Sequence, residues 1–393
     1  MSDPSFPPEQ ARRYARQLSL PGVGTGGQRR LLDASVALVG VGGLGSPMAL
    51  YLAAAGVGRL VLVDGDAVDA TNLHRQVIYG TGDVGRPKVE VAAERLRERN
   101  PDVRVEAHAV ALEAANALEL LGDVDVVADG SDNFPTRYLV NDACVLLGKP
   151  NAHGSIYRFE GQVSWFDAPS GPCYRCLHPD PPPPGLVPSC AEAGVLGALP
   201  GVIGCLQATE VLKHILGAGE NLSGRLLVYD ALAMTFRELR LRRDPACPAC
   251  GPEATLKVLE DLPGYCRADT DPESAEGGAS DAGDPGDHPI LVSPEEVAGR
   301  LATAEPPVLV DVREEWEFRM GSLPEALHIP FGTLGVRWEE IPPDRDVVVF
   351  CHMGIRSFEA LRFLRSRGRE RVFSLDGGTD AWSVRVDPSL PRY

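Results

Sequence analysis

The chain has 393 residues, of which 44% are hydrophobic and 24% are charged, both ordinary values for a globular protein. Because this length exceeds what one ordinary hydrophobic core supports, two domains are expected. The net charge of −17 argues against nucleic acid or an anionic membrane as the main partner, since both repel a negative surface.

The first ten residues lack the basic and then apolar order of a secretory signal, so a cytoplasmic protein is expected. One stretch imitates a membrane span, because residues 34–58 carry no charged side chain. Six glycines interrupt residues 38–58, however, and this pattern is more typical of a strand, a tight turn and a buried helix.

Apolar runs alternate with helical patterns through about residues 10–250. Strands are predicted at residues 34–40, 59–64, 103–109 and 124–129, and a helix at residues 87–99. This alternation predicts an α/β domain with a mostly parallel sheet covered by helices.

A glycine-rich turn follows the first predicted strand and opens a helix. Gly40, Gly42, Gly43 and Gly45 stand where glycines let backbone amides approach a phosphate at the helix N-terminus. Asp64 ends the next strand, about where a Rossmann-like domain places its ribose-binding acid. The motif alone does not tell NAD, FAD or ATP apart, and a turn without any ligand is the alternative.

Polar and charged residues follow the later strands of this domain; they are Asn72, Arg75, Lys88, Asp132 and Asn133. The carboxyl ends of parallel strands face the ligand crevice, so Arg75, Lys88 and Asp132 are expected to converge on one phosphate group. Two cations and one acid suit a triphosphate with Mg²⁺ better than a nicotinamide. Each of these charges taken singly is more often a solvated surface group.

The motifs GxGGLG, NLxRQ, GxPK and SDN, in this order, resemble those of the MoeB/ThiF adenylyltransferases, which are relatives of the ubiquitin-activating enzymes. The resemblance covers about residues 8–266 and includes an RYxRQ segment at residues 13–17. It implies that Arg16 reaches into the nucleotide site of a partner subunit, and therefore a homodimer.

The same resemblance assigns roles to the residues of the crevice. Asp64 is expected to bind the ribose of ATP, and Asp132 is expected to be associated with Mg²⁺. Asn72, Arg75 and Lys88 are expected to contact the phosphates.

Two CxxC motifs, Cys173/Cys176 and Cys247/Cys250, each provide two thiolates from one turn. Four sulfur ligands form a closed tetrahedral Zn²⁺ site with a structural role, because no coordination position stays open. Buried inert cysteines or a redox pair are the alternative. The MoeB/ThiF resemblance implies the same four-cysteine site.

Cys190 lies after a proline run, in a segment that is not expected to form regular helix or strand. The related segment in this family carries a thiol proposed to form a thioester or a mixed disulfide with the carrier protein. An incidental loop cysteine is the alternative. Cys144, Cys205 and Cys266 receive no role.

Residues 267–288 are rich in acids, Gly, Ser and Pro and have little to bury, so they are predicted to form a flexible linker. An acidic docking segment is the alternative. A second, small α/β domain is predicted at residues 289–393, with strands at residues 307–311 and 346–350.

Cys351 follows the last of these strands and opens a loop that leads into a helix. The thiol is expected to face helix-terminal amides and Arg356, which would stabilise a persulfide anion. The spacing of Cys351 and Arg356 is also close to that of phosphatase loops, and a buried structural cysteine without a catalytic role is the other alternative.

Segments at residues 311–318, 328–330, 376–378 and 381–382 resemble a single rhodanese domain over about residues 290–388. Residues 321–326 depart from the usual GHIPGA segment of that family, away from the Cys351 loop. The resemblance implies that Cys351 carries the persulfide.

These features together predict an enzyme that uses ATP to adenylylate the C-terminal glycine of a small ubiquitin-like sulfur-carrier protein ending in Gly-Gly. A Cys351 persulfide, charged by an upstream donor, would then displace AMP, and Cys190 would help to release a thiocarboxylate. Molybdopterin, thiamine, a thiolated tRNA base and cysteine are all possible end products.

Three other functions remain open from the sequence. An NAD or FAD oxidoreductase leaves Arg75, Lys88 and Asp132 without a reason. An enzyme that activates a ubiquitin-like protein for attachment to lysine leaves the rhodanese-like domain idle. A zinc-stabilised scaffold for sulfur-relay proteins would not turn over ATP.

Overall fold

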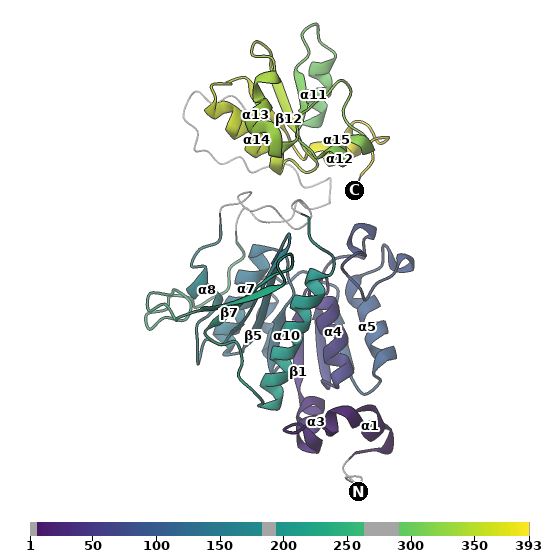
Figure 1. Cartoon of the computed structure of the whole chain (residues 1–393), viewed down its shortest axis with the longest axis vertical. Coiled ribbons are helices and arrows are strands. Elements are labelled where there is room, and N and C mark those ends of the chain that lie inside the picture. Colours follow the sequence, from purple (N-terminus) through teal and green to yellow (C-terminus); the bar gives the residue numbers. More distant parts are fainter. Residues whose placement is uncertain (1–5, 183–193, 263–290, 393) are drawn as a thin grey trace. The chain divides into compact units, whose positions relative to one another are not determined.

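The computed structural model describes residues 6–182, 194–262 and 291–392 (Figure 1). The chain divides into two compact units, Met1–Asp269 and Thr270–Tyr393, and each is described by itself. The predicted linker at residues 267–288 lies outside the described residues.

The first unit is built on one sheet of eight strands in the order β3-β2-β1-β4-β5-β6-β7-β8. Strands β3 to β5 in this order are parallel, and β5 to β8 are antiparallel. The strands are β1 (Ser35–Val39), β2 (Arg59–Val63), β3 (Arg104–His108), β4 (Val126–Asp129), β5 (Asn151–Tyr157), β6 (Glu160–Phe166), β7 (Arg225–Asp230) and β8 (Thr235–Arg240).

Helices cover the parallel part of this sheet on both faces. Those of the described residues are α1 (Pro8–Arg13), α2 (Ala15–Leu18), α3 (Gly24–Asp33), α4 (Gly45–Ala55), α5 (Lys88–Arg99), α6 (Ala117–Gly122), α7 (Phe134–Leu147), α8 (Tyr174–Leu177) and α10 (Leu199–Leu216), with short 3-10 helices at Ala70–Asn72 and Thr81–Asp83. Helices α4, α5 and α10 pack on one face of the sheet, and α6 and α7 pack on the other.

The central strand shows why the sequence folds this way. Val36 and Leu38 of β1 enter the core on one face, whereas Ala37 and Val39 enter the core on the other. A strand buried on both faces needs a continuous apolar run, and each fully buried Val or Leu contributes about 1.5–3 kcal/mol. The uncharged run at residues 34–58 therefore folds as β1 and α4. Among the described residues, no helix has both the length and the apolar character needed to span a membrane.

The strand order reverses next to β1, because the chain passes from β1 to β2 on one side and places β4 on the other. In an open parallel sheet a ligand crevice lies beyond the carboxyl ends of the strands at such a switch point. The predicted glycine-rich turn follows β1, and the polar cluster at residues 129–133 follows β4, so both lie at this point.

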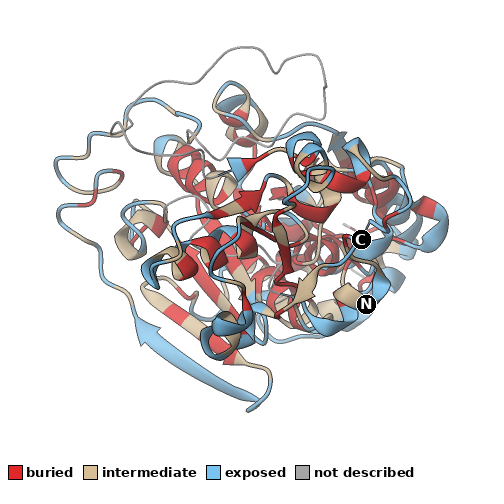
Figure 2. Cartoon of the chain, turned by 90° about the horizontal axis from the view of Figure 1, so that it is seen from above, coloured by how far each residue is buried: buried red, intermediate tan, exposed pale blue. Residues whose placement is uncertain are grey.

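The antiparallel part of the sheet is less covered. Strand β8 ends the sheet and is exposed at all six residues, as the pale blue strand at its edge shows (Figure 2). Leu232, Met234 and Phe236 at or near its start are each more than half exposed.

The second unit has a sheet of five parallel strands in the order β11-β10-β12-β13-β9. They are β9 (Leu291–Val292), β10 (Val308–Asp311), β11 (Leu327–His328), β12 (Val347–Phe350) and β13 (Val372–Leu375). The helices are α11 (Pro294–Leu301), α12 (Glu315–Met320), α13 (Phe331–Arg337), α14 (Ile355–Ser366) and α15 (Gly378–Arg385), with a 3-10 turn at Trp338–Glu340. Helices α13 and α14 pack on one face of the sheet, and α11 and α15 pack on the other.

Candidate nucleotide site, metal site and reactive thiols

The glycine turn, residues 40–45, packs backbone against backbone. A Cβ on Gly40 would lie 2.9 Å from the carbonyl oxygen of Gly130, and Gly40 has a φ of +82°. A Cβ on Gly45 would lie 2.0 Å from the carbonyl oxygen of Gly40. Side chains at these positions are therefore excluded, and the turn brings its backbone amides to the start of α4, where an anion is favoured.

Asp64, the predicted ribose-binding acid, lies directly beside the glycine turn. Its carboxylate accepts hydrogen bonds from the backbone N–H of Val41 at 2.8 Å and of Asp66 at 2.9 Å. Burial raises the pKa of Asp64 above its ordinary value, although the charge of Lys88 and the two amides oppose that rise. The carboxylate thus fixes the turn and is held at the end of β2.

Lys88 is the first residue of α5, and its side chain is only 5% exposed. Its Nζ lies 2.9 Å from Oδ2 of Asp66. The ammonium group is therefore held by a carboxylate two residues beyond Asp64, one that the motifs of the sequence do not mark. Asp66 belongs to the same short acidic segment after β2, but nothing local indicates that it would pair with Lys88.

Arg75 and Gln76 lie over the glycine turn. The Cδ of Arg75 is 3.7 Å from where a Cβ on Gly43 would stand, and Gln76 Nε2 is 3.3 Å from the equivalent position on Gly42. Arg75 donates one long hydrogen bond of 3.4 Å to the Thr71 carbonyl oxygen. No carboxylate forms an ion pair with Arg75 in the part of the chain that the structure describes.

Gln76 is 4% exposed, and its Oε1 has no hydrogen-bond partner among the described residues. A buried polar atom without a partner beside a cradle of glycines fits a site that awaits a polar ligand. Gln76 is the last residue of the NLxRQ motif, but its sequence context does not mark its side chain as a ligand-binding group. Asn72 supports this segment with its backbone, because its carbonyl oxygen accepts from the N–H groups of Arg75 and Gln76 at 3.0 Å each.

The SDN loop, residues 131–133, follows β4 and leads into α7. Asp129 is fully buried, and its Oδ1 accepts hydrogen bonds from the backbone N–H and the hydroxyl of Ser131, at 3.0 and 2.6 Å. Asp132 is exposed, so its carboxylate is open to a cation. Asn133 is also exposed, and its Oδ1 accepts from the Thr136 N–H at 2.9 Å as the N-cap of α7.

A buried hydrogen-bond partner holds Asp129 in place. Its Oδ2 lies 3.1 Å from Nδ1 of His153 on the neighbouring strand β5. Burial alone would raise the pKa of Asp129, but the hydrogen bond and charge of His153, the charge of Arg137 and the hydrogen bond from Ser131 together outweigh burial and keep this pKa below its ordinary value. Burial lowers the pKa of His153, so the pair consists of a carboxylate and a neutral imidazole at neutral pH.

Arg16 does not join this site within its own chain. It is an exposed residue of α2, and the neighbouring Gln17 donates a hydrogen bond of 3.0 Å to the carbonyl oxygen of Ala55. Ala55 ends α4, whereas the glycine turn opens it. The 11 residues of α4 separate the two places by about 16 Å at the usual rise of a helix.

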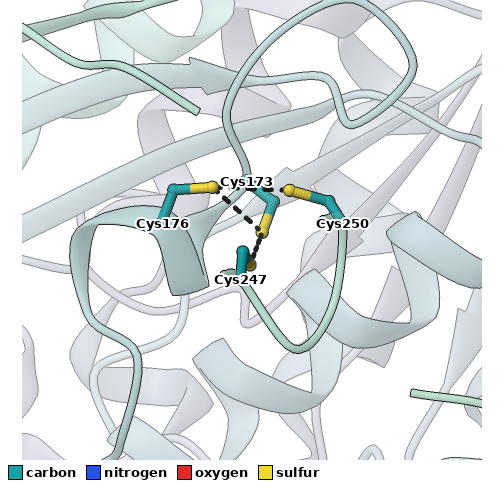
Figure 3. Close-up of side chains that lie close together, drawn as sticks. All are labelled: Cys173, Cys176, Cys247 and Cys250. Atoms are coloured by element: carbon teal, nitrogen blue, oxygen red, sulfur yellow. Dashed lines mark hydrogen bonds between the residues drawn. The ribbon is translucent and has the colours of Figure 1, made fainter. Parts of the chain in front are cut away.

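The four cysteines of the CxxC motifs come together, with all sulfur atoms within 4.8 Å of one another (Figure 3). The Sγ distances are 4.0 Å for Cys173–Cys176, 3.6 Å for Cys173–Cys247 and 3.4 Å for Cys176–Cys250. Tetrahedral Zn²⁺ with sulfur ligands requires separations of about 3.8 Å. Burial, followed by the hydrogen bond with Cys176, raises the pKa of Cys250 to about 11, and burial also raises that of Cys173, so these two sulfurs need a cation to hold them as thiolates.

Cys190 lies outside the described residues, as does Cys266. The described residues that follow Cys190 pack against other segments of the first unit. Val195 forms a β-bridge with Arg158, and a Cβ on Gly197 would lie 2.5 Å from the carbonyl oxygen of His74.

In the second unit, the Cys351 loop, residues 351–357, follows β12 and leads into α14. The Cys351 Sγ accepts a hydrogen bond of 3.1 Å from the N–H of Gly354, so the thiol faces a backbone amide. A Cβ on Gly378 would lie 2.4 Å from the carbonyl oxygen of Cys351, and the Thr379 N–H donates to that oxygen at 2.8 Å. The glycine pair before α15 thereby supports the loop from behind.

Arg356, which the sequence predicts to face the thiol together with the helix-terminal amides, also forms an ion pair. Its guanidinium forms two hydrogen bonds of 2.6 and 2.7 Å with the carboxylate of Glu317, which is 3% exposed. Glu317 belongs to α12, so this ion pair ties α12 to the first turn of α14. The charge of Arg356 is therefore compensated, and the sequence analysis missed Glu317 because the two residues lie 39 positions apart.

Comparison with known proteins agrees with both units. The model of the ThiF family matches residues 14–249, and that of the rhodanese-like domain matches residues 293–385. A sulfur carrier protein adenylyltransferase from Thermus thermophilus is 59% identical over 263 residues, which cover 66% of this chain and 97% of that protein. A probable adenylyltransferase/sulfurtransferase MoeZ from Mycobacterium tuberculosis is 43% identical over 98% of this chain and 96% of that protein.

Among solved structures, a crystal structure of E. coli MccB with MccA-N7isoASN superimposes with a TM-score of 0.53. It covers 61% of this chain and 74% of MccB, with 22% sequence identity. This similarity supports the fold of the first unit.

Proposed function

Because the chain belongs to the ThiF family of adenylyltransferases and also carries the rhodanese-like domain of a sulfurtransferase, we propose that its substrate is the C-terminal glycine of a small ubiquitin-like sulfur-carrier protein. The relative from Thermus thermophilus is named for acting on a sulfur carrier protein, and it matches two thirds of this chain. The adenylyltransferase part is assigned to residues 8–266 and the sulfurtransferase part to residues 289–393.

The first step follows from the chemistry of a carboxylate, which is a poor electrophile. The terminal glycine carboxylate of the carrier attacks the α-phosphorus of ATP, pyrophosphate leaves, and an acyl-adenylate forms. Arg75 and Lys88 neutralise the charge that develops on the phosphates, and the backbone amides of the glycine turn orient them. Asp64 accepts from the ribose hydroxyls, and Asn72 supports the Arg75 segment.

Asp132 is the residue best placed to hold Mg²⁺, because its exposed carboxylate follows β4 at the switch point of the sheet. When bound, the ion supplies positive charge to the phosphate oxygens. Asn133 caps α7 and keeps the SDN loop in place for this role.

One observation carries the assignment of the nucleotide. Arg75 and Gln76 lie over a glycine turn where the neighbouring backbone leaves no room for a side chain at Gly40 or Gly45, and the Gln76 Oε1 has no hydrogen-bond partner among the described residues. Arg75 forms no ion pair with a carboxylate of the described residues, and such a guanidinium at this cradle suits a polyphosphate, whereas a nicotinamide dinucleotide does not call for it.

The second half of the reaction uses Cys351 and, as proposed, Cys190. An upstream donor supplies a sulfane sulfur, so that Cys351 carries a persulfide. The terminal sulfur attacks the acyl-adenylate carbonyl, AMP leaves, and the carrier becomes joined to Cys351 through an acyl disulfide. The thiolate of Cys190 then attacks the Cys351 sulfur, the thiocarboxylate leaves, and the resulting Cys190–Cys351 disulfide is reduced by an external thiol.

Arg16 is proposed to act in the nucleotide site of a second subunit. Within one chain it lies at the far end of α4 from the glycine turn, while its side chain is exposed. A twofold dimer that brings α2 of one subunit to the glycine turn of the other reconciles this position with a role beside ATP.

The decisive experiment mixes the protein with ATP, Mg²⁺ and purified candidate carriers ending in Gly-Gly, and follows carrier mass and ATP–pyrophosphate exchange. An AMP adduct is expected on the matching carrier, and a thiocarboxylate is expected once a persulfide donor is added. A carrier that lacks its terminal glycine serves as the control. Transfer of the carrier to lysine would favour the conjugating function, and binding of NAD without ATP would favour the oxidoreductase. The carrier that reacts also identifies the pathway.

A further inference from the structure

Helix α7 connects two places that the proposed function treats as separate. Its N-terminus begins directly after the SDN loop, and its second half holds the first CxxC motif. The Asn141 Oδ1 accepts a hydrogen bond of 2.7 Å from the Tyr174 N–H, next to Cys173. The Asp142 carboxylate accepts from the Arg175 guanidinium at 2.8 and 2.7 Å. The segment that supplies two sulfur ligands is therefore clamped to the helix that follows Asp132.

A second connection runs through the interior of the unit. The Tyr174 ring lies with its centroid 4.9 Å from that of His153. His153 hydrogen-bonds Asp129 at 3.1 Å, and Asp129 in turn fixes the Ser131 N–H and hydroxyl. Three consecutive contacts thus lead from the neighbour of a metal ligand to the SDN loop.

Arg137 closes the network between these two connections. It lies in the first half of α7 and donates a hydrogen bond of 3.3 Å to the carbonyl oxygen of Ser131. Because Arg137 belongs to the same helix as Asn141 and Asp142, this hydrogen bond ties the SDN loop to the helix that clamps the CxxC segment.

The members of this network are buried, with relative exposures of 0% for Asp129, 1% for Asn141, 3% for Tyr174, 4% for His153, 7% for Asp142 and 8% for Arg137. Water does not replace a lost partner at such positions, and a buried charge without its partner is costly. A displacement of the CxxC segment is therefore passed on to α7 and the SDN loop rather than absorbed by solvent.

We propose that the four-cysteine metal site is a positioning element of the ATP–Mg²⁺ site, acting through Tyr174 and Arg175 on α7 and the SDN loop. The inference rests on the proposed function of the nucleotide site. It has a thermodynamic consequence, because a metal that strengthens nucleotide binding must itself be bound more tightly when the nucleotide is present.

The test measures the affinity of the full-length protein for zinc at equilibrium, by competition with a chromogenic chelator, with and without ATP–Mg²⁺ and a non-reacting carrier that lacks its terminal glycine. ATP–Mg²⁺ is expected to raise this affinity by at least about fivefold, the lower end of typical coupling between sites. Asp142→Asn keeps all four cysteines but weakens the clamp, so the ratio of the zinc affinities with and without ATP–Mg²⁺ is expected to shrink toward one.

Glu106→Gln is the matched control. It makes the same chemical change in a carboxylate that also accepts two hydrogen bonds from one arginine, Arg59, at 3.0 and 3.1 Å, but it lies on β3. This variant is expected to keep the full effect of ATP–Mg²⁺ on zinc affinity. Asn141→Leu, which removes the amide oxygen that accepts from the Tyr174 N–H, is the second variant and covers the case in which Asp142→Asn does not fold.

The outcomes separate the two proposals. Equal zinc affinities with and without ATP–Mg²⁺, in a protein that adenylylates its carrier, would overturn the coupling and leave the proposed function standing. The coupling is also wrong if Asp142→Asn and Asn141→Leu retain the wild-type ratio of affinities. A wild-type protein that binds no ATP–Mg²⁺ in calorimetry would overturn both.

Discussion

The glycine turn of the first unit and the Cys351 loop of the second are built alike, but they differ in whether the nearby arginine is paired with a carboxylate. Both follow a buried parallel strand, both lead into a helix, and in both a glycine avoids a clash with a neighbouring carbonyl oxygen. Above the glycine turn Arg75 has no acidic partner among the described residues, whereas beside the Cys351 loop Arg356 is neutralised by Glu317. We infer that the guanidinium of Arg75 at the first loop binds a polyanion, whereas at the second loop backbone amides stabilise a single sulfur anion.

The largest effect is expected from removing the thiol of the second loop. Cys351→Ala should lower thiocarboxylate formation by more than about three orders of magnitude, the scale of losing a nucleophile. ATP–pyrophosphate exchange should stay within about twofold, because the cations of the glycine turn belong to the other unit. Parallel exchange and mass-spectrometric assays measure both, and a loss of exchange in this variant would refute the division of work between the two loops.

The buried ion pair gives the next largest effect, on stability. Arg356→Met leaves the Glu317 carboxylate buried without its cation, which costs about 3 kcal/mol, the lower end for breaking such a pair because Arg356 keeps some exposure. Calorimetry of the full chain should show one unfolding transition shifted down and the other unchanged. Adding Glu317→Gln should restore part of the loss, and no shift at all would mean that the arginine is not neutralised as described.

Arg75 should behave in the opposite way. Arg75→Ala is expected to lower the rate of ATP–pyrophosphate exchange by about 10²–10³, as for the loss of one preorganised charge on a transferring phosphoryl group. Because its guanidinium makes only one long hydrogen bond, the melting temperatures should not change. A variant that exchanges normally but melts earlier would reverse the comparison of the two arginines.

The smallest expected effect concerns acid. The hydrogen bond and charge of Arg59 lower the pKa of Glu106 in the first unit, so the carboxylate stabilises the fold above its ordinary pKa of about 4.3. This contribution is lost as the pH falls through the lowered pKa. Glu106→Gln should therefore melt slightly earlier than the wild type at pH 7, and the two should converge as the pH falls from about 5 to about 3. A difference in melting temperature between the two proteins that grows as the pH falls would contradict this prediction.

Much of the fold was predictable because its signals are local. The apolar runs at residues 34–40, 59–64 and 124–129 fold as β1, β2 and β4, and glycine spacing alone located the turn after β1. The four cysteines also assembled as expected, since each CxxC motif brings two ligands by itself.

The partners of individual side chains were not predictable in the same way. Glu317 reaches Arg356 from 39 positions away, His153 reaches Asp129 from 24, and Asp66 reaches Lys88 from 22. Such pairs depend on which helix or strand lies next to which, and no periodic pattern encodes that. The sequence therefore identified the charged groups at the strand ends, but not which of them are already neutralised by a neighbour.

If Arg16 acts in the nucleotide site of a second subunit, as proposed, a defective chain can be repaired by a chain with a different defect. In a mixture of equal amounts of Arg16→Ala and Arg75→Ala, half of randomly formed twofold dimers are mixed, and each mixed dimer assembles one intact site from two damaged copies. About a quarter of wild-type exchange should then return from two nearly inactive preparations. Complementation of this kind would mean that each active centre is built from residues of two polypeptides.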